Sequence, residues 1–463
     1  DDAIFQGSGV VLAIDQDGQA AFEGGTAPDA RIAVEQGAEL VAAGGGRIVI
    51  LAPEVINEGR IETPDGQALL AASTDRVFLQ ASDDNGLRGL LVEVDTGGTV
   101  TNLGDIVAER GNITLAGLAV NQQGNLTATT SVRSNGSIRL LARDQAEAVI
   151  LGGNRPVLET TNAGTLTFGE GSVTQVLPEL DDPELAVDEQ AQGLSFIEAM
   201  GRQVTLQSNS TVLATGGDIN IQATVSPRAI GTAQDPNDAQ IFLAEGAVID
   251  ASGDESTVVA MERNVVEIEL RGNELADAPL QRDSVIRGEA VRIDVRVGTP
   301  LANVDGALDS VERGVGERLA SGGTITLGSE GSVVVNDGAV IDVSGGQVRY
   351  EDGIINTTQL VSNGQVVDIG LADPNVVYDA IATDYVYFHE RWGVTETFPE
   401  FGSSQGRFEA GYVEGLDAGS INILAPDALL NGRFIAGRTV GRLQRLPTDF
   451  ALAKRAQHVG GQR

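Results

Sequence analysis

The sequence predicts an all-β fold, namely a right-handed parallel β-helix (a solenoid) with lateral insertions. Two observations lead to this prediction. A five-residue unit, in which Gly and a polar residue precede alternating aliphatic and polar positions, recurs along the chain. The composition agrees with it, because 41% of the residues are hydrophobic, only 4% are aromatic, and there are 59 Gly. Aliphatic side chains and frequent glycines suit many short strands that are separated by tight corners.

The recurring unit has the alternation expected of a strand that buries one face. Its copies begin at Gly46, Gly66, Gly111, Gly136, Gly164, Gly217, Gly323 and Gly419. A glycine before each strand supplies a corner that a side chain would obstruct. The alternation then predicts which aliphatic residues point into the core, and these are Ile48, Ile50, Ile113, Leu115, Ile138, Leu140, Ile219, Ile221, Ile325 and Leu327.

A second unit alternates with the first and contains an Asn or Asp corner. It reads Val-Ile-Asn-Glu-Gly over 55–59, and a related version, Ala-Val-Ile-Asp-x-Ser-Gly, occurs over 247–253 and again over 339–345. The short polar side chain at this corner can satisfy backbone groups of a turn. We therefore interpret these stretches as further strands of the same coils.

The spacing of the glycines indicates the length of one coil. Neighbouring copies lie 20, 25 and 28 residues apart (66 − 46, 136 − 111 and 164 − 136). With coils stacked at about 4.8 Å, the chain would form about 15 to 18 coils in a rod about 70 to 90 Å long. The alternative fold, a β-sandwich, is less consistent with the sequence because Asn-Gly hairpin signals between matched strands are scarce.

Three stretches interrupt the repeat. The segment 306–322 contains Asp309 and Glu312 at capping-box spacing and one apolar stripe, which predicts a short helix. The predicted organisation is β-helix coils over 1–177 (following or ending a secretion domain), an acidic insertion over 178–200, coils over 201–349 with a short helix near 309–320, an aromatic-rich insertion over 350–412, coils over 413–440, and a tail or the start of a next segment over 441–463.

Several motifs give the chain a family resemblance. The stretches 45–67, 89–94 and 117–124 resemble filamentous-haemagglutinin-type large exoproteins, the substrates of two-partner secretion systems. The stretches 270–275, 298–302 and 391–397 are similar to a domain of unassigned activity in the same exoproteins. The resemblance implies a secreted, extracellular protein at the bacterial cell surface that is exported through an outer-membrane β-barrel transporter. Because the Asn-Pro-Asn signatures of the family's secretion domain are absent from this sequence, we expect the export signal to lie outside it.

Charge and composition bear on catalysis and partners. The net charge of −36 repels the phosphates of nucleic acid, so we expect no nucleic-acid partner. Some parallel β-helices are polysaccharide lyases or hydrolases, which need a base or a pair of carboxylates. The only Lys is Lys454, near the end of the sequence, and among 66 acidic residues some pair meets the glycosidase spacing by chance. We therefore expect no enzyme and no catalytic residues.

Metal and cofactor motifs are missing from the sequence. There is no Cys, and His389 and His458 have no companion at ligand spacing, so no zinc site is expected. We also expect no cofactor. Adventitious Ca²⁺ binding stays open because sites made only of oxygen ligands need no motif.

The segment 350–412 is the compositional outlier of the chain. It holds all five Tyr, the only Trp and four of the twelve Phe. Tyr and Trp are favoured at protein interfaces and against sugar rings. The candidate contact surface therefore consists of Tyr378, Tyr385, Tyr387, Trp392 and Phe401. Alternatively, the aromatic side chains build a small core of the insertion itself, with Trp392 inside it.

These inferences together predict a structural or adhesive shaft segment of a secreted or surface-displayed bacterial exoprotein. We expect it to mediate adhesion or contact with other cells and with matrix. The expected partners are the β-barrel transporter, a host or bacterial surface protein or glycan, and further copies of the chain in a homo-oligomer. The alternatives are a carbohydrate-active β-helix enzyme (a lyase or hydrolase) and a self-assembling extracellular filament subunit.

Overall fold

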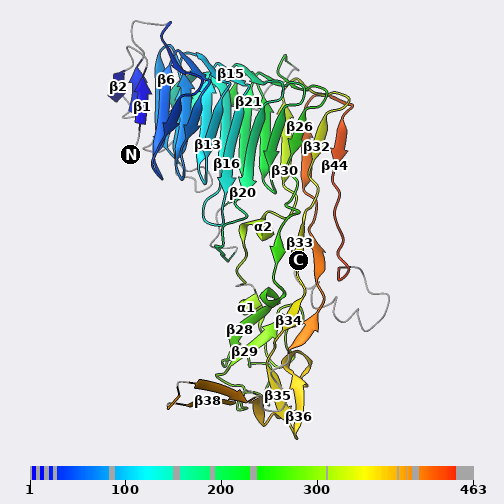
Figure 1. The fold of residues 1–463 in the computed structure, drawn as a ribbon. Coiled ribbons are helices and arrows are strands. Elements are labelled where there is room, and N and C mark those ends of the chain that lie inside the picture. Colours follow the sequence, from blue (N-terminus) through cyan, green and yellow to red (C-terminus); the bar gives the residue numbers. More distant parts are fainter. Residues whose placement is uncertain are drawn as a thin grey trace.

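The computed structural model describes residues 3–6, 11–14, 20–23, 29–82, 89–149, 157–187, 193–229, 237–308, 311–382, 385–389, 391–392, 394–398 and 406–444. In this part of the chain, the fold is a parallel β-helix with three long sheets. The chain passes through sheet 1, sheet 2 and sheet 3 in turn and then enters the next coil. Figure 1 shows these coils as a rod, with an appendage that projects from its C-terminal half.

The three sheets contain the strands of successive coils. Sheet 1 consists of β1 (Ala3–Gln6), β6 (Arg47–Ala52), β9 (Gln67–Ala72), β14 (Asn112–Gly117), β17 (Ser137–Val149), β21 (Phe196–Gly201), β24 (Asp218–Ala223), β30 (Thr324–Ser329) and β42 (Ser420–Leu424). Sheet 2 consists of β4 (Arg31–Val34), β7 (Glu54–Asn57), β12 (Thr99–Asn102), β15 (Ala119–Gln122), β19 (Thr165–Phe168), β22 (Gln203–Leu206), β25 (Gln240–Leu243), β31 (Ser332–Val335) and β43 (Asp427–Leu430). Sheet 3 consists of β5 (Glu39–Val41), β8 (Arg60–Glu62), β13 (Asp105–Ala108), β16 (Asn125–Thr130), β20 (Val173–Pro178), β23 (Thr211–Ala214), β26 (Val248–Asp250), β32 (Val340–Asp342) and β44 (Arg433–Ile435).

The rod is shorter than the sequence predicted. The described residues make nine coils, since sheets 2 and 3 each have nine strands. At the strand spacing these coils span about 40 Å. The prediction of about 15 to 18 coils is wrong because long segments of the chain leave the rod between strands.

Inside the rod, aliphatic residues stack in register from coil to coil. In sheet 1, for example, Ile138 pairs with Ile113 in one neighbouring coil and with Ile197 in the other. The ten residues predicted to point inward are each at most 1% exposed, and they belong to one continuous core. The predicted strand register is therefore confirmed.

The corner between sheets 2 and 3 carries a buried polar ladder. The Asn57 side-chain amide donates to Asn102 Oδ1 at 2.7 Å, and the Asn102 amide donates to Gln122 Oε1 at 2.8 Å. The three side chains are fully buried and lie in register in successive coils. The buried side-chain amides thus provide hydrogen-bond partners for one another, as buried polar groups require.

The recurring glycines mark the corner between sheets 3 and 1. Seven of the eight copies directly precede a strand of sheet 1, whereas Gly164 precedes β19 in sheet 2. A Cβ on Gly323 would lie 1.8 Å from the Gly217 carbonyl oxygen, and one on Gly419 would lie 1.7 Å from the Gly323 carbonyl oxygen. Glycine is needed here because the main chain of the adjacent coil occupies the space of a side chain.

Two hairpins cover the outer face of the N-terminal coils. β2 (Val11–Ile14), β3 (Ala20–Glu23), β10 (Arg76–Ala81) and β11 (Leu90–Val94) form an antiparallel sheet. Val77 and Val92 of this sheet pack on Leu51 and Leu69, which face outward from sheet 1. β17 continues beyond the rod and pairs with β18 (Val157–Ala163), and a short 3₁₀ turn, η2 (Pro227–Ala229), follows β24.

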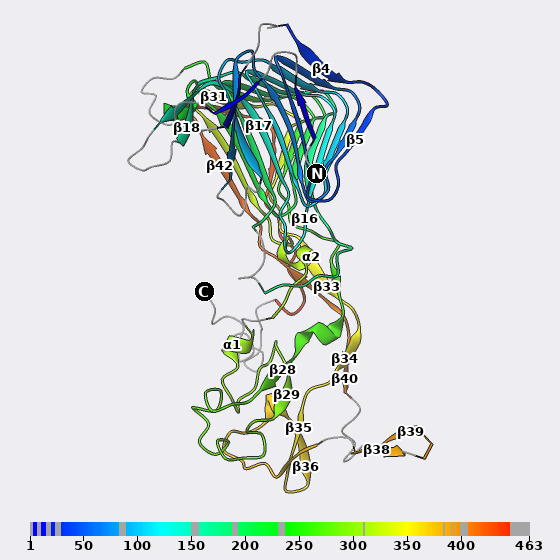
Figure 2. The ribbon, with the colours of Figure 1, turned by 90° about the vertical axis from the view of Figure 1, so that its left-hand side faces the viewer.

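The appendage consists of two excursions from the corner between sheets 3 and 1. The first comprises residues 254–322, between β26 and β30, and the second comprises residues 346–418, between β32 and β42. Figure 2 shows both excursions below the coils. Their described elements are β27 (Val258–Val259), η3 (Met261–Asn264), β28 (Val265–Glu269), β29 (Ala290–Asp294), α1 (Asp305–Leu308), α2 (Val315–Arg318), β33 (Gln347–Tyr350), β34 (Gly353–Ile355), β35 (Gln359–Ser362), β36 (Gln365–Asp368), η4 (Ile369–Leu371), β37 (Ala380–Ala382), β38 (Tyr385–His389), β39 (Val394–Phe398), β40 (Arg407–Glu409) and β41 (Tyr412–Gly415). None of the described helices is long and apolar enough to cross a membrane.

The observed boundaries correct the predicted ones. The prediction of rod coils throughout 201–349 is wrong for 254–322, where the strands pair within the appendage. The residues 196–200, assigned to the acidic insertion, belong to β21. Asp309 lies outside the described residues, and the described helix within the predicted range 309–320 is α2, before which the Gly314 amide donates to the Glu317 carboxylate at 2.9 Å.

Replacing Gly323 with Ala tests the stacking of the corners. The new Cβ would collide with the Gly217 carbonyl, so the two coils must separate, and we expect a loss of about 1–3 kcal/mol. Urea unfolding followed by far-UV circular dichroism measures this as a lower midpoint. The matched control is Gly272→Ala, because a Cβ there meets no atom within 4 Å. Equal midpoints for the two variants would contradict the stacking argument.

Candidate functional site

The two excursions leave the rod at equivalent points of successive coils. Asp250 and Asp342 are register partners, and each accepts a hydrogen bond at 2.8 Å from the backbone N–H two residues later. The next residues are Ser252-Gly253 in one coil and Ser344-Gly345 in the other. Because the two exits are stacked, the excursions begin side by side.

A neck connects the rod to the appendage, and it is packed through glycines. A Cβ on Gly253 would lie 2.0 Å from the Ala320 carbonyl oxygen, and one on Gly346 would lie 2.0 Å from the Asp254 carbonyl oxygen. Beyond these glycines, β33 pairs with β27 of the first excursion and with β41 of the second. The neck therefore consists of several chains in contact and not of one linker.

Aromatic side chains continue the neck toward the distal part of the appendage. The rings of Tyr350 and Tyr412 stack with 4.6 Å between their centroids. The Tyr412 hydroxyl donates to Asn264 Oδ1 at 3.2 Å, and the Arg296 guanidinium lies 5.5 Å from the Tyr412 ring centroid. Burial raises the pKa of both tyrosines above its ordinary value. Two of the five Tyr thus join the excursions to each other.

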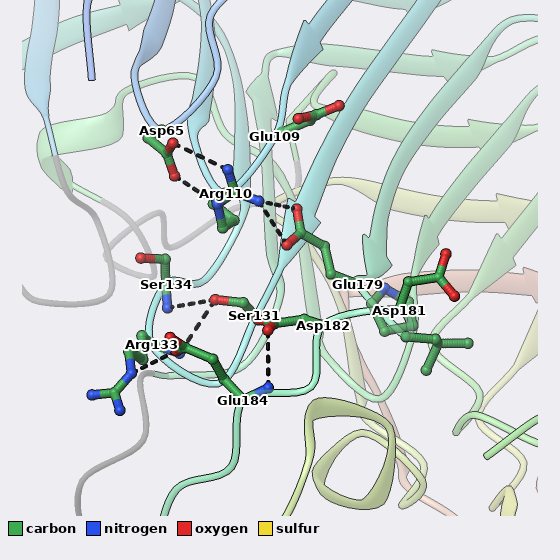
Figure 3. A pocket seen from close by; sticks show the side chains of 12 residues that line it. Asp65, Glu109, Arg110, Ser131, Arg133, Ser134, Glu179, Asp181, Asp182 and Glu184 are labelled. Carbon is green, nitrogen blue, oxygen red and sulfur yellow. Dashed lines mark hydrogen bonds and ion pairs between the residues drawn. The ribbon is translucent and has the colours of Figure 1, made fainter. Parts of the chain in front are cut away.

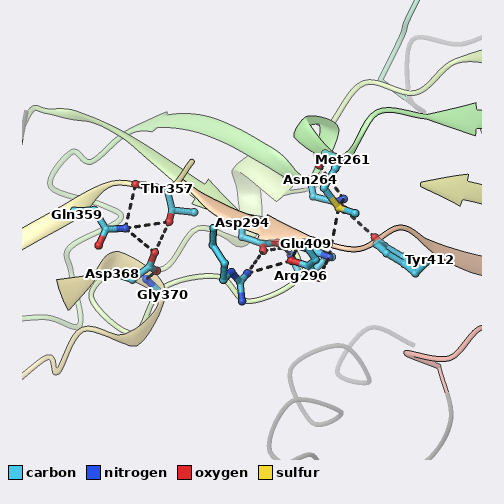
Figure 4. Close-up of polar contacts among 11 residues, drawn as sticks. Met261, Asn264, Asp294, Arg296, Thr357, Gln359, Asp368, Gly370, Glu409 and Tyr412 are labelled. Carbon is cyan, nitrogen blue, oxygen red and sulfur yellow. Dashed lines mark hydrogen bonds and ion pairs between the residues drawn. The ribbon is translucent and has the colours of Figure 1, made fainter. Parts of the chain in front are cut away.

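An ion-pair network centred on Arg296 holds the two excursions together (Figure 4). The guanidinium donates to Asp294 of the first excursion at 2.7 and 2.9 Å, and to Glu409 of the second at 2.8 and 2.9 Å. Burial alone would lower the pKa of Arg296, but the hydrogen bonds to the two carboxylates raise it above its ordinary range. The Asp294 side chain is only 4% exposed, and Arg296 is its main counter-charge, with Arg407 farther away at 3.6 Å.

The distal part of the appendage, which we call the lobe, has a hydrophobic core of its own. Both excursions contribute to it. The buried residues of this core are Ile268, Leu270, Leu275, Ile286, Val291, Ile293, Leu301 and Val304 from the first excursion, and Leu360, Ile369, Ala372 and Tyr378 from the second. The core is separate from that of the rod, so the lobe is a second folding unit built from two distant segments of the sequence.

Two of the predicted contact residues lie in opposite environments, one buried and one exposed. Tyr378 is 3% exposed, packs in the lobe core and donates its hydroxyl to the Asp373 carbonyl at 3.2 Å. It cannot belong to an exposed patch, so this assignment was wrong. Trp392 is 68% exposed, with the Arg391 guanidinium 6.0 Å from its ring. The alternative prediction, a core containing Trp392, was also wrong.

The remaining predicted contact residues belong to or follow a hairpin. Tyr385 and Tyr387 are on β38, which pairs with β39 in a two-stranded sheet, and Phe401 lies outside the described residues. Figures 1 and 2 show this hairpin projecting from the lobe. Trp392 therefore stands near the hairpin turn, at the far end of the appendage.

Exposed apolar side chains gather on the lobe. Leu371 and Val377 are more than half exposed, and Leu280 is nearly half exposed. The Gln281 side chain donates to the Val376 carbonyl at 2.8 Å, which brings the segment around Leu280 beside the one around Val377. Large exposed apolar groups held on a rigid unit are suited to a contact with another molecule.

A groove lies on the corner of the rod between sheets 3 and 1, beside the acidic insertion (Figure 3). It has a volume of about 920 Å³, and its lining consists of Asp65, Glu109, Arg110, Ser131, Arg133, Ser134, Pro178, Glu179, Leu180, Asp181, Asp182 and Glu184. Arg110 donates to Asp65 at 2.6 Å and to Glu179 at 2.9 Å. The insertion then continues to Ala186, which forms a β-bridge with Arg313 of the first excursion.

The ion pairs limit the chemistry of this groove. Hydrogen bonds to Asp65 and Glu179 raise the pKa of Arg110, so it stays protonated and cannot act as a base. Glu179 also accepts a hydrogen bond from Thr129 Oγ1 at 2.6 Å. Arg110 therefore fastens the start of the acidic insertion to two other coils. Among the described residues, no three His, Asp or Glu side chains are grouped so that they could hold a metal ion.

Comparisons with known proteins add no assignment. No protein-family model matches the chain, and no curated protein matches it.

Sequence reasoning identified most of the second excursion as the aromatic-rich insertion over 350–412 but missed the first excursion, although a signal for it was present. The register aligns Ser252-Gly253 with Thr215-Gly216 of the preceding coil, and Gly323 with Gly217. The corner Thr215-Gly216-Gly217 is thus repeated as Ser252-Gly253 and Gly323, and again as Ser344-Gly345 and Gly419, with an excursion between the two glycines each time. These corners, each interrupted between its two glycines, would have identified both insertions in the sequence.

Replacing Arg296 with Gln tests the ion-pair network. The change leaves the buried Asp294 carboxylate without its main counter-charge, and we expect the lobe to lose about 3 kcal/mol. Native-state hydrogen exchange should show faster exchange in β29, with no change at rod positions such as Ile138. The control is Arg271→Gln, which removes an exposed pair with Glu269 and should leave exchange unchanged. Equal exchange in both variants would show that the network does not hold the lobe.

Proposed function

We propose that this chain is a structural and adhesive segment of a secreted, surface-displayed bacterial exoprotein, in which the rod is the stiff support and the lobe is the contact head. One observation carries the proposal: two successive coils send out excursions that fold together into a separate lobe. Such an arrangement holds a recognition unit away from a support in a defined orientation. Adhesion and cell–cell or matrix contact use this geometry directly.

The attachment of the lobe supports this function. A head on a flexible linker would sample many orientations, and each contact would lose the entropy of ordering it. Here the neck consists of β27, β33 and β41, together with the Tyr350–Tyr412 stack and the Arg296 network. The rod and the lobe therefore behave as one rigid body, so that a force applied to the lobe is transmitted to the coils.

The surface of the lobe indicates the class of partner. Trp392, Leu371 and Val377 are more than half exposed. Aromatic and aliphatic side chains of this size fit an apolar patch of a host or bacterial surface protein, and an exposed indole also stacks on the faces of sugar rings. The net charge of −36 disfavours binding to nucleic acid.

Export through an outer-membrane β-barrel transporter is the route we propose. It follows from the resemblance of the quoted motifs to two-partner secretion substrates. The sequence has no Cys, so no disulfide can lock a folded state before the chain passes a narrow pore. The vectorial stacking of coils would then allow the rod to fold one coil at a time as it emerges.

Excising the lobe tests its role as the contact head. Deletion of 254–322 and 346–418 leaves Ser252-Gly253-Gly323 and Ser344-Gly345-Gly419, which match the intact corner at 215–217. We expect the rod to keep its far-UV circular dichroism per residue, while binding to bacterial and host cell surfaces or matrix is lost.

Point variants separate this outcome from a folding defect. Leu371→Ser with Val377→Ser should weaken binding at least ~10-fold without lowering the melting temperature. The matched pair on the rod, Val41→Ser with Leu103→Ser, also removes two exposed aliphatic side chains and should leave binding intact. If the lobe-free rod binds as well as the full chain, the lobe is not the contact head.

A carbohydrate-active enzyme is the second candidate, and the groove is the observation that favours it. The groove combines six carboxylates with Arg110 and Arg133 beside the acidic insertion. Its central carboxylates, Asp65 and Glu179, are however already neutralised by Arg110. This leaves neither a free base nor a free carboxylate pair at the centre of the groove, and it favours the adhesive function.

Assays on polysaccharides distinguish the two candidates. We expect no turnover of pectin, alginate or hyaluronan, with or without Ca²⁺, as measured by release of reducing or unsaturated ends. The matched variants are Glu179→Gln in the groove and Glu184→Gln at its rim. A saturable cleavage that only Glu179→Gln abolishes would establish an enzyme and overturn the proposal.

A further inference from the structure

The outer face of sheet 2 carries a strip of uncharged side chains. The first and third residues of each strand in this sheet point outward, because side chains alternate between the two faces. In the six consecutive strands from β12 to β31, none of these outward residues is charged. Most of them are Thr, Asn, Gln or Ser, and five are Thr, namely Thr99, Thr101, Thr165, Thr167 and Thr205. The pairing of neighbouring coils aligns them in two columns along the rod, which we call the polar strip.

Charged residues bound the polar strip. The first outward position is Glu54 in β7, on one side of the strip, and Asp427 in β43, on the other. The outer face of sheet 3 is different again, because it partly exposes Asp105, Asp250 and Asp342. In a chain with a net charge of −36, six adjacent coils without an outward charge form a distinct surface.

The polar strip is on the side of the rod opposite the appendage, because both excursions leave the rod at the corner between sheets 3 and 1. Figure 2 shows β4 and β31 of sheet 2 above the coils and the appendage below them. Hairpins pack on the outer face of sheet 1, whereas none of the hydrophobic clusters formed by the described residues includes a side chain of the strip. All outward residues of the strip are at least partly exposed. A molecule bound there therefore leaves the lobe unobstructed.

The side chains of the strip are suited to a partner that is rich in hydroxyl groups. The Asn121 amide donates to Thr101 Oγ1 at 3.3 Å, and the Gln240 amide donates to Ser332 Oγ at 3.0 Å. A hydroxyl has one donor and two acceptor positions, so these groups keep hydrogen-bonding capacity toward solvent. Phe242 adds a partly exposed ring, and aromatic rings pack well on the apolar faces of sugars. Hydroxyl, amide and aromatic groups together suit the recognition of neutral sugars.

The dimensions of the strip distinguish a polymer chain from a second rod. Six strands of four residues cover about 25 Å along the rod and about 13 Å across it. This area of about 300 Å² is well below the about 800 Å² that each partner buries in a stable protein interface. A single extended polysaccharide chain is narrow enough for the strip, and the strand spacing is close to the length of one sugar residue in such a chain. The net charge of the protein repels polyanions, which favours an uncharged polymer.

We infer that the polar strip binds an uncharged, linear polysaccharide that runs along the rod, with its hydroxyl groups on the Thr, Asn and Gln side chains and a sugar ring against Phe242. Each hydrogen bond replaces one to water, so the net gain of each contact is small and a single polymer chain binds weakly. The strip therefore adds to the attachment provided by the lobe, and it does not depend on the lobe.

Affinity electrophoresis of the full chain tests this contact. The native gels contain hydroxyethyl cellulose, glucomannan or mixed-linkage β-glucan, which are neutral and linear, or carboxymethyl cellulose, which is anionic. We expect at least one neutral polymer to retard the chain and carboxymethyl cellulose not to retard it. Retardation by none of the neutral polymers, or equal retardation by carboxymethyl cellulose and hydroxyethyl cellulose, would overturn the inference.

Paired variants locate the contact on the rod. Thr101→Glu with Thr205→Glu places two carboxylates in the strip, where a bound polymer would remove them from water, and should weaken binding at least ~10-fold. The matched control, Thr127→Glu with Thr211→Glu, adds the same charge at outward positions of sheet 3 and should bind like the unmodified chain. The melting temperature of both variants should stay unchanged.

Two outcomes of this comparison would contradict the inference. Equal binding by the two variants would show that the polymer does not lie on the strip. Analytical ultracentrifugation identifies the other occupant: a dimer that forms with the unmodified chain and is lost only in the Thr101/Thr205 variant would show that a second copy covers the strip.

Discussion

The structure depends on the close approach of main chains in stacked coils. Strands in a sheet lie about 4.8 Å apart, and in a β-helix the corners must stack at the same spacing as the strands. At the corner between sheets 3 and 1, the carbonyl of Gly217 occupies the place of a Cβ on Gly323, and the carbonyl of Gly323 does so for Gly419. The glycine column therefore sets the register of every strand that follows it. Ile219, Ile325 and Ile421 are brought into one column of the core as a consequence.

The same constraint explains why the rod tolerates long insertions. A coil needs only its strands and the glycine that starts sheet 1, so any length of chain can be inserted before that glycine. Both excursions occupy this position, and their exits are one strand spacing apart. The two adjacent excursions combine their apolar residues in one core, to which the first contributes eight buried residues and the second four. The Arg296 network then joins them, because the buried Asp294 and the partly exposed Glu409 come from different excursions and both pair with Arg296.

Arginine has the same role in the groove and in the lobe. In the groove, Arg110 joins Asp65 and Glu179 and thereby fixes the acidic insertion against the coils. In the lobe, Arg296 joins two excursions, and the distal surface beyond it exposes the apolar side chains of Leu371, Val377 and Trp392. Positive charge is scarce in this chain, with 30 Lys and Arg against 66 Asp and Glu. In both places Arg closes a junction between segments, which leaves the apolar lobe surface as the more suitable site for recognition.

The sequence by itself determined the rod. The burial of Ile138 and Leu140 and the corner role of Gly323 follow from period-two alternation and from the absence of space for a Cβ, and both are local properties. The tertiary structure alone decided how many strands belong to the rod. β28 alternates like a rod strand but pairs with β29 in the lobe, because alternation specifies a buried face and not the partner that covers it. It also decided that Tyr378 is buried and Trp392 exposed. Tyr378 packs with Leu270 and Ile293, about a hundred residues earlier in the chain, and such proximity arises only when stacked corners bring two excursions together.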